Sequence, residues 1–189
     1  MAISSTTLDY SSSLREYMVS EKDYLSQHPE YDLVATGAIV FNKEGRLLLV
    51  QRAADEQAFP NLWIPGGKVD DTDETIVQAA VRELKEETGL EATRVVRKVS
   101  HFTFGDKRPG RPTKTWLKLV FEVEVQSTDD VVLDPIEHQE FVFASEEDIV
   151  NDVVGEARLR YISPANKAVK LEAFRVRREG MSSAQQGVA

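Results

Sequence analysis

The stretch from Pro65 to Leu90, PGGKVDDTDETIVQAAVRELKEETGL, decides the fold of this chain. Thr75 and Gln78 form the pair of a capping box, which is typical of a helix N-terminus, and Gly89 is typical of the position just past a helix end. Between these two signals, apolar residues recur at the spacing of one helical face. The sequence therefore predicts a helix from about Ile76 to Thr88, preceded by a glycine turn and an acidic loop.

Three glutamates share one side of this predicted helix. Glu83, Glu86 and Glu87 fall within an arc of about 100°, next to the apolar arc. Like charges at this spacing repel each other by about 0.2–0.5 kcal/mol per pair, and Arg82 at the edge of the arc can hydrogen-bond one of the carboxylates. Hard oxygen ligands on a rigid element suit Mg²⁺ or Mn²⁺, which would turn the repulsion into attraction. A solvated, charged helix face is the alternative that the spacing leaves open.

The segment from Gly67 to Leu90 resembles the Nudix box, the pattern Gx5Ex7REUxEExGU in which U is an aliphatic residue. From Glu74 onward every fixed position matches. The six residues KVDDTD, instead of five, separate Gly67 from Glu74, so the loop carries one extra residue. The preceding stretch FPNLWIPGG is similar to the segment found in family members that hydrolyse nucleoside triphosphates, including oxidised ones.

The resemblance implies a fold of the α/β class, a Nudix-type α/β/α sandwich with a mixed β-sheet. The box helix would lie on one face and the C-terminal helix on the other. It also implies an enzyme, a metal-dependent hydrolase of a nucleoside diphosphate linked to another moiety, such as a nucleoside triphosphate, a nucleotide sugar or a dinucleotide. Water would attack a phosphoanhydride bond, as in a pyrophosphatase. A Nudix-fold nucleotide-binding or regulatory protein with weak catalysis is the alternative.

The resemblance further implies roles for individual residues. Glu83, Glu86, Glu87 and the carbonyl of Gly66 would bind the cofactor, Mg²⁺ or Mn²⁺. Family members often have a further acidic residue near the strand that follows the long hairpin, and Glu137 and Glu140 are the candidates here. We select Glu140, and an ordinary acidic turn is the alternative for both. The predicted catalytic set is Glu83, Glu86, Glu87, Arg82 and Glu140.

Substrate contacts are predicted from charge and aromatic character. Arg52 at the end of a strand and Lys68 in the glycine loop could meet phosphate groups of the substrate. Trp63 is assigned to the nucleotide base, with Phe59 and Trp116 as alternatives. A place in the core is the more common role of a large aromatic residue.

The composition excludes several kinds of partner and chemistry. A formal net charge of −9 argues against a nucleic-acid duplex, which needs a basic face, and fits a cationic partner or a metal better. The family resemblance implies a small-molecule nucleotide diphosphate as the substrate. The chain has no cysteine, which excludes disulfides and thiolate chemistry. No segment resembles a signal peptide or a membrane span, so a cytoplasmic location without membrane contact is expected. His101 and His138 are assigned to the surface or to a sheet.

The chain divides into three parts by its sequence pattern. Residues 1–30 form an N-terminal extension, partly helical between Leu14 and His28, that could pack across a homodimer. Residues 31–178 form the Nudix hydrolase domain, and residues 179–189 form a disordered tail. Within the domain, apolar and β-branched runs predict a hairpin of residues 31–41 and 46–52, long strands at 93–104 and 113–125, and a short strand at 140–144. Further helices are predicted to begin after Ser145 and Ser163.

Overall fold

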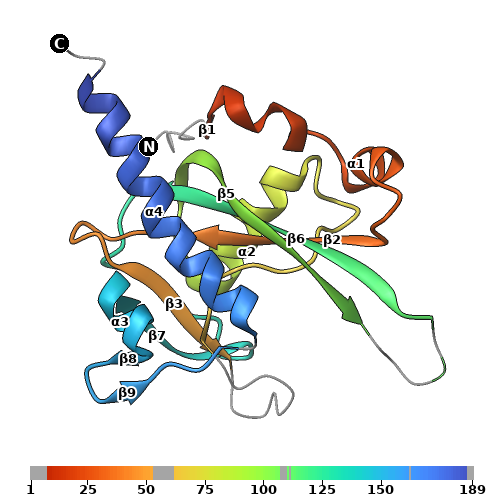
Figure 1. Ribbon diagram of the computed structural model, residues 1–189. Helices are drawn as coiled ribbons and strands as arrows, with labels where there is room; N and C mark the ends of the chain where they lie inside the picture. Colours follow the sequence, from red (N-terminus) through yellow and green to blue (C-terminus); the bar gives the residue numbers. More distant parts are fainter. Residues whose placement is uncertain (1–7, 53–61, 107–109, 111, 162, 187–189) are drawn as a thin grey trace, which may run out of the picture.

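The computed structural model describes residues 8–52, 62–106, 110, 112–161 and 163–186 (Figure 1). The described strands form a four-stranded sheet of order β1-β5-β6-β2, a three-stranded sheet of order β4-β3-β7 and the small pair β8-β9. The strands are β1 Asp9–Tyr10, β2 Leu33–Ile39, β3 Leu47–Arg52, β4 Leu62–Trp63, β5 Ala92–Asp106, β6 Lys114–Val125, β7 His138–Ala144, β8 Val153–Val154 and β9 Ala157–Arg158. The helices are η1 Ser12–Tyr17, α1 Glu21–Gln27, α2 Ile76–Thr88, α3 Glu146–Asn151 and α4 Pro164–Gln186.

Helices cover both faces of the sheets, and α2 and α4 lie on opposite sides of the strands (Figure 1). Side chains along a strand alternate between its two faces. In β3, Leu48 and Val50 pack in the core beneath α2, whereas Leu47 and Leu49 pack in a second core with residues of α3 and α4. In the four-stranded sheet, β2 runs parallel to β6 while β5 runs antiparallel to it. The predicted α/β/α sandwich with a mixed sheet is confirmed.

The box helix α2 has the predicted bounds. The Thr75 side chain accepts a hydrogen bond from the backbone N–H of Gln78 at 3.1 Å. Gln78 Oε1 accepts from the backbone N–H of Glu74 at 2.9 Å, one residue before the position that a full capping box requires. Gly89 ends the helix in the left-handed conformation, with φ of 70°. Local sequence signals were sufficient here because both ends depend on residues within the segment itself.

The predicted hairpin of residues 31–41 and 46–52 forms only next to its turn, where the backbone N–H of Leu48 donates to the Val40 carbonyl at 2.9 Å, and its longer strand pairing is wrong. β2 pairs with β6 from Leu33↔Trp116 to Ile39↔Glu122, while β3 pairs with β7 and β4, so the two segments belong to different sheets. An isolated bridge between Phe41 and Leu47 joins them where the chain crosses over. Both strands are rich in buried apolar side chains, and such a pattern predicts a strand without specifying its neighbour.

The N-terminal segment is built into the main core. In place of one helix from Leu14 to His28, it forms η1 and α1, because Ser20 accepts the backbone N–H of Asp23 and starts a new helix. Leu14, Tyr17 and Tyr24 are buried in the same cluster as α2. Since these apolar side chains pack inside their own chain, they do not supply a dimer contact, and homodimer formation stays a prediction.

The C-terminal helix extends further than predicted. α4 begins at Pro164, as expected, with the backbone N–H of Asn166 donating to Ser163 Oγ at 3.2 Å. It runs to Gln186, so the disordered tail of residues 179–189 is wrong for residues 179–186. Packing extends the helix: Gly180 lies against the guanidinium of Arg97, which also donates to the carbonyl of Val176 at 3.0 Å. Among the described residues, no helix combines the length and the apolar character that a membrane crossing requires.

Candidate active site

The glycine turn before α2 is locked against strand β2. The backbone N–H of Thr36 donates to the Gly67 carbonyl and that of Ala38 to the Pro65 carbonyl, both at 2.8 Å. Gly66, between them, has φ of 142°, and a Cβ there would lie 2.2 Å from the carbonyl oxygen of Thr36. Only glycine fits this position. The turn aims the backbone N–H of Gly66 at Glu87 Oε2, 2.8 Å away.

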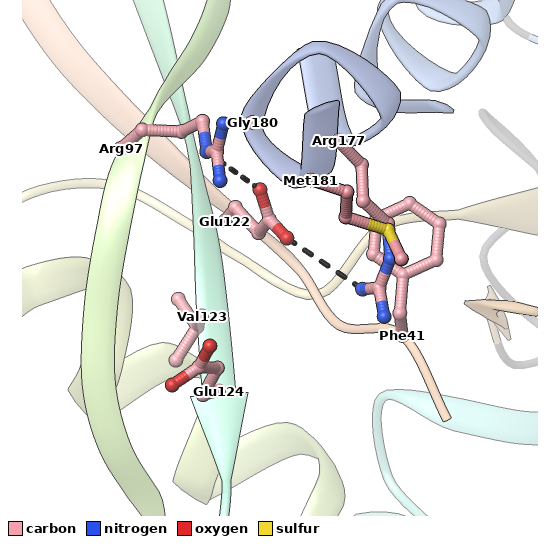
Figure 2. A pocket seen from close by; sticks show the side chains of 8 residues that line it. All are labelled: Phe41, Arg97, Glu122, Val123, Glu124, Arg177, Gly180 and Met181. Atoms are coloured by element: carbon pink, nitrogen blue, oxygen red, sulfur yellow. Dashed lines mark ion pairs between the residues drawn. The ribbon is translucent and has the colours of Figure 1, made fainter. Parts of the chain in front are cut away.

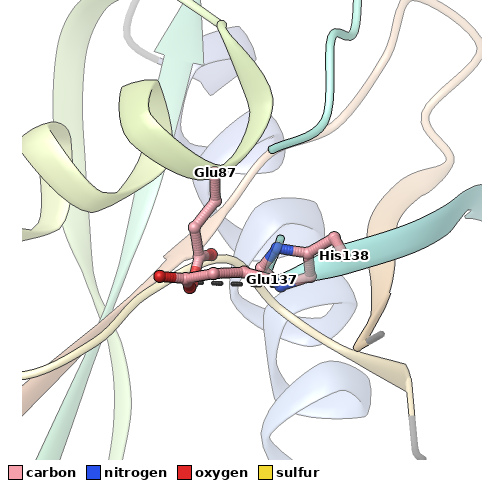
Figure 3. A group of neighbouring side chains, drawn as sticks. All are labelled: Glu87, Glu137 and His138. Atoms are coloured by element: carbon pink, nitrogen blue, oxygen red, sulfur yellow. Dashed lines mark ion pairs between the residues drawn. The ribbon is translucent and has the colours of Figure 1, made fainter. Parts of the chain in front are cut away.

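Glu87 lies at the centre of a group of three potential metal ligands. Its side chain is 5% exposed, and Oε1 lies 3.9 Å from Nε2 of His138, which is also buried. Ligand atoms of Glu87, Glu137 and His138 lie within 4.8 Å of one another (Figure 3). The box helix provides the first residue, and the chain at the start of β7 provides the other two. His138 is therefore a sheet residue, as predicted, but it faces the carboxylate helix.

The electrostatic environment of Glu87 is unfavourable for an isolated carboxylate. The pKa of Glu87 is raised to about 8, mainly by burial and also by the nearby Glu83 carboxylate. The hydrogen bond from the Gly66 N–H opposes this rise. Lys118 on β6 is buried as well, and its burial lowers the pKa of the ammonium group to about 8, while attraction to Glu87 opposes that shift. Both groups titrate near neutrality because the site has removed them from water.

Glu83 and Glu86 are held by one arginine. Arg82 Nη1 donates to Glu83 Oε1 at 2.9 Å and to Glu86 Oε2 at 2.8 Å. The Glu83 carboxylate lies against Gly67, and burial raises its pKa while Arg82 opposes the rise. The side chain of Glu86 is 59% exposed. Arg82 thus orients two of the predicted ligands, one more than the sequence predicted.

Because the loop has one extra residue, Asp73 pairs with Arg82, a contact that the sequence did not predict. Its carboxylate accepts from Arg82 Nε and Nη2, both at 2.8 Å, and from the backbone N–H of Asp70. The backbone N–H of Asp73 donates back to the Asp70 carbonyl, which closes a tight turn. Asp73, and not Glu74, follows Gly67 after five residues. Counted from Gly67, the acidic position of the box therefore falls on Asp73. Counted back from Arg82, it falls on Glu74.

A cleft of about 600 Å³ opens beside the glycine turn. Arg52 and Lys68 line it, so the structure places both predicted phosphate-binding residues at one cavity. Phe104 and Trp116 form an aromatic wall, with ring centroids 5.7 Å apart and planes 11° from parallel. The N-terminal turn of α4, including Asn166, closes another side of the cleft.

Other predicted residues lie elsewhere. Trp63 belongs to β4, opposite Val50, but its side chain and all of Phe59 lie outside the described residues. Trp116, the alternative aromatic residue, does line the cleft. Glu140 pairs with Gln51 in the sheet, and its side chain is exposed. It does not belong to the group around Glu87, where the structure brings Glu137 instead.

Two groups that sequence reasoning missed are Lys118 and His138. Lys118 interrupts the apolar run TWLKLVF, and a lysine inside a strand of that kind is a signal of an unusual environment. His138 falls where the pairing of β3 with β7 shifts register between Gln51 and Arg52. The irregular pairing changes which side chains face the site, and the sequence alone does not reveal it.

The fold and the site define a class of proteins: α/β/α sandwiches in which a glycine turn at the wall of a cleft leads into a carboxylate-rich helix. The family profile of the NUDIX domain matches residues 32–164, and the chain belongs to this family. This result confirms the resemblance that the box residues indicated.

Curated relatives and solved structures agree with the assignment. The chain is 46% identical over 63 residues to the CTP pyrophosphohydrolase of Escherichia coli (strain K12). The aligned region covers 32% of this chain and 44% of the relative. It is 35% identical over 91 residues to the 8-oxo-dGTP diphosphatase of the same strain, covering 46% of this chain and 64% of the relative. The match thus spans less than two thirds of either relative. The crystal structure of the MutT protein from Methanosarcina mazei Go1 is 26% identical, with a TM-score of 0.58 over 77% of this chain and 94% of that chain.

Proposed function

We propose that this protein hydrolyses a phosphoanhydride bond of a nucleoside diphosphate derivative with the help of Mg²⁺ or Mn²⁺. The observation that carries the proposal is the buried carboxylate of Glu87, grouped with Glu137 and His138 next to Glu83. A buried carboxylate among further acidic groups is costly unless a cation joins it. The proposal is supported by family membership and by the two phosphohydrolases among the relatives.

The donor set suits a hard divalent ion. Glu83, Glu86, Glu87 and the Gly66 carbonyl are the proposed ligands, and Glu137 replaces Glu140 as the additional acidic residue. Carboxylate and carbonyl oxygens are the ligands that Mg²⁺ and Mn²⁺ prefer. When bound, such an ion neutralises phosphate oxygens and stabilises the charge that develops on the leaving phosphate.

The residues of the chain perform the remaining work. Arg52 and Lys68 bind and orient the phosphates from the wall of the cleft. A carboxylate of the site accepts the proton of the attacking water. The hydrogen bonds of Arg82 to Glu83 and Glu86 keep these carboxylates in place without a rearrangement during the reaction.

The proposed substrates are nucleoside triphosphates. The cleft combines phosphate-binding cations with the stacked pair Phe104 and Trp116, against which a planar base can pack. A volume of about 600 Å³ lies in the range of small-molecule sites. Nucleotide sugars and dinucleotides are the other members of the same class.

The test is a substrate panel of nucleoside triphosphates, nucleotide sugars and dinucleotides, assayed with Mg²⁺, with Mn²⁺ and with a chelator. We expect metal-dependent release of phosphate, pyrophosphate or a nucleoside monophosphate from at least one triphosphate. Nucleotide binding without turnover on the whole panel would contradict the proposal. It would favour a Nudix-fold binding or regulatory protein instead.

Metal binding is expected to depend on pH through Glu87. Its pKa in the folded protein, about 8, exceeds the ordinary value of 4.5, so without metal the folded state holds an extra proton between these two values. This contribution to stability is lost as the pH rises toward 8. An ion must displace that proton, so the apparent affinity for Mg²⁺ should fall about tenfold per pH unit below about pH 8.

Thermal unfolding with and without Mg²⁺, at about pH 6 and about pH 8.5, measures this effect. The rise in Tm that a fixed Mg²⁺ concentration produces should be larger at the higher pH. The Glu87→Gln variant is the matched control, since it has no proton to release at this position. An equal pH dependence in the two proteins would show that Glu87 is not the titrating ligand.

A further inference from the structure

Lys170 is a buried lysine that the proposed chemistry does not use. It lies on α4, its relative exposure is 0%, and it is not among the residues that line the cleft. Its Nζ donates to Asn166 Oδ1 at 2.6 Å and to the Asn166 carbonyl at 3.1 Å, and it lies 5.2 Å from the centre of the Tyr161 ring. Burying a lysine is costly, so this residue calls for a role.

The partner of Lys170 is a wall residue of the cleft. Asn166 is 4% exposed and lines the cavity together with Phe104 and Trp116. Its backbone N–H donates to Ser163 Oγ, so its main chain is fixed in the first turn of α4. The side-chain amide could still present either its oxygen or its nitrogen to the cleft, because the two ends have nearly the same shape.

Lys170 decides between these two orientations. A lysine ammonium has N–H donors and no acceptor, so only the amide oxygen can face it. Burial, with a smaller effect of Lys118, lowers the pKa of Lys170 to about 7. The ammonium can pair only with the amide oxygen, whereas the neutral amine has a lone pair that could also accept from the amide NH₂, so Lys170 fixes the orientation while it is protonated. The amide NH₂ is left for the cleft.

We propose that Lys170 is a positioning residue that sets base selectivity, by fixing the Asn166 amide so that the cleft offers a hydrogen-bond donor. This inference rests on the proposed function. A base with a carbonyl acceptor at the edge that meets Asn166 is then favoured over a base with an amino group there. The base stacks against Phe104 and Trp116, and the Asn166 amide donates a hydrogen bond to its edge.

The test compares two pairs of nucleotides that differ in this respect: ITP with ATP, and UTP with CTP. For the parent we expect the keto member of at least one pair to have the higher kcat/KM, by about tenfold, since a missing partner leaves a buried polar group unpaired. Lys170→Met should reduce this ratio at least fivefold, through KM more than kcat. In the background of Asn166→Ala, Lys170→Met should change the ratio no further, because Lys170 acts only through Asn166.

Asn166→Asp provides a test that leaves the buried lysine in place. One carboxylate oxygen pairs with Lys170, and the other presents an acceptor to the cleft, so the preference should move toward ATP or CTP. An unchanged ratio in both Lys170→Met and Asn166→Asp would overturn the inference. If Lys170→Met changed the keto-to-amino ratio of kcat/KM equally in the parent and in the Asn166→Ala background, the inference would be overturned too.

The two proposals fail in distinguishable ways. A parent that turns over no member of the substrate panel contradicts the proposed function, and the ratios for the four nucleotides are then read from dissociation constants. A parent that hydrolyses keto and amino members equally well supports the function and overturns the inference. Folding of each variant is checked by its Tm, and the double variant with Asn166→Ala separates a structural effect of Lys170→Met from a change in selectivity.

Discussion

Glu87→Gln is expected to lower kcat by about 10³-fold or more at saturating metal. Ion-assisted stabilisation of the developing charge is worth several kcal/mol, and about 1.4 kcal/mol corresponds to a factor of ten. The fold should survive the change, because the amide oxygen of Gln can accept the same hydrogen bond from Gly66 N–H. Burial already favours the neutral form of this side chain, so the Tm of the metal-free variant should equal or exceed that of the parent. Steady-state kinetics and thermal unfolding on the same preparations measure both effects.

Glu140→Gln is the matched control for this substitution. Glu140 lies on the neighbouring strand β7 with an exposed side chain, and we expect its replacement to change kcat less than twofold. Glu137→Gln should reduce activity by at least about tenfold, because Glu137 belongs to the group around Glu87. A large loss for Glu140→Gln together with a small one for Glu137→Gln would restore the original assignment of Glu140. More than a tenth of the parent activity in Glu87→Gln would contradict the metal site.

Glu122→Gln is expected to lower the free energy of unfolding by about 1 kcal/mol. Glu122 is 7% exposed and lies between two arginines: Arg97 Nε at 2.9 Å and Arg177 Nη1 at 3.6 Å (Figure 2). This cluster ties α4 to strands β5 and β6. Burial raises the pKa of Glu122, which offsets part of the attraction to the arginines, and both arginines are about one-third exposed, so neither is left as a fully buried unpaired charge. For a chain of this length the Tm should fall by about 2–4 °C.

Glu124→Gln is the control for Glu122. It lies two residues further along β6, on the rim of the same small cavity, but its side chain is exposed. Surface substitutions of this kind usually change stability by less than about 0.5 kcal/mol. Urea unfolding of both variants measures the difference. Equal values for the two would show that the Glu122 cluster does not stabilise the attachment of α4.

The same strand illustrates how far a sequence pattern reaches. In β6, Leu117, Leu119 and Phe121 alternate with Lys118, Val120 and Glu122, and the first set packs beneath α2. Alternation predicts a strand with one apolar and one polar face, and the polar face would ordinarily be solvent-exposed. In the structure α4 covers that face, so Lys118 borders the cleft and Glu122 the arginine cluster. Lys118 and Glu122 are buried because α4, about fifty residues further along the chain, packs over β6.

By itself, the sequence determined the box helix, its caps and the orientation of its carboxylates by Arg82, because each of these depends on residues within a few positions of one another. Only the tertiary structure decided which strands are neighbours, that Asp73 takes the partner position opposite Arg82, and that Glu137 and His138 join Glu87. It also decided that Lys170 and Asn166, one turn apart on α4, are buried. Pairing across sheets, a register shift and burial by a distant helix are properties of the packed chain, and no local pattern of residues contains them.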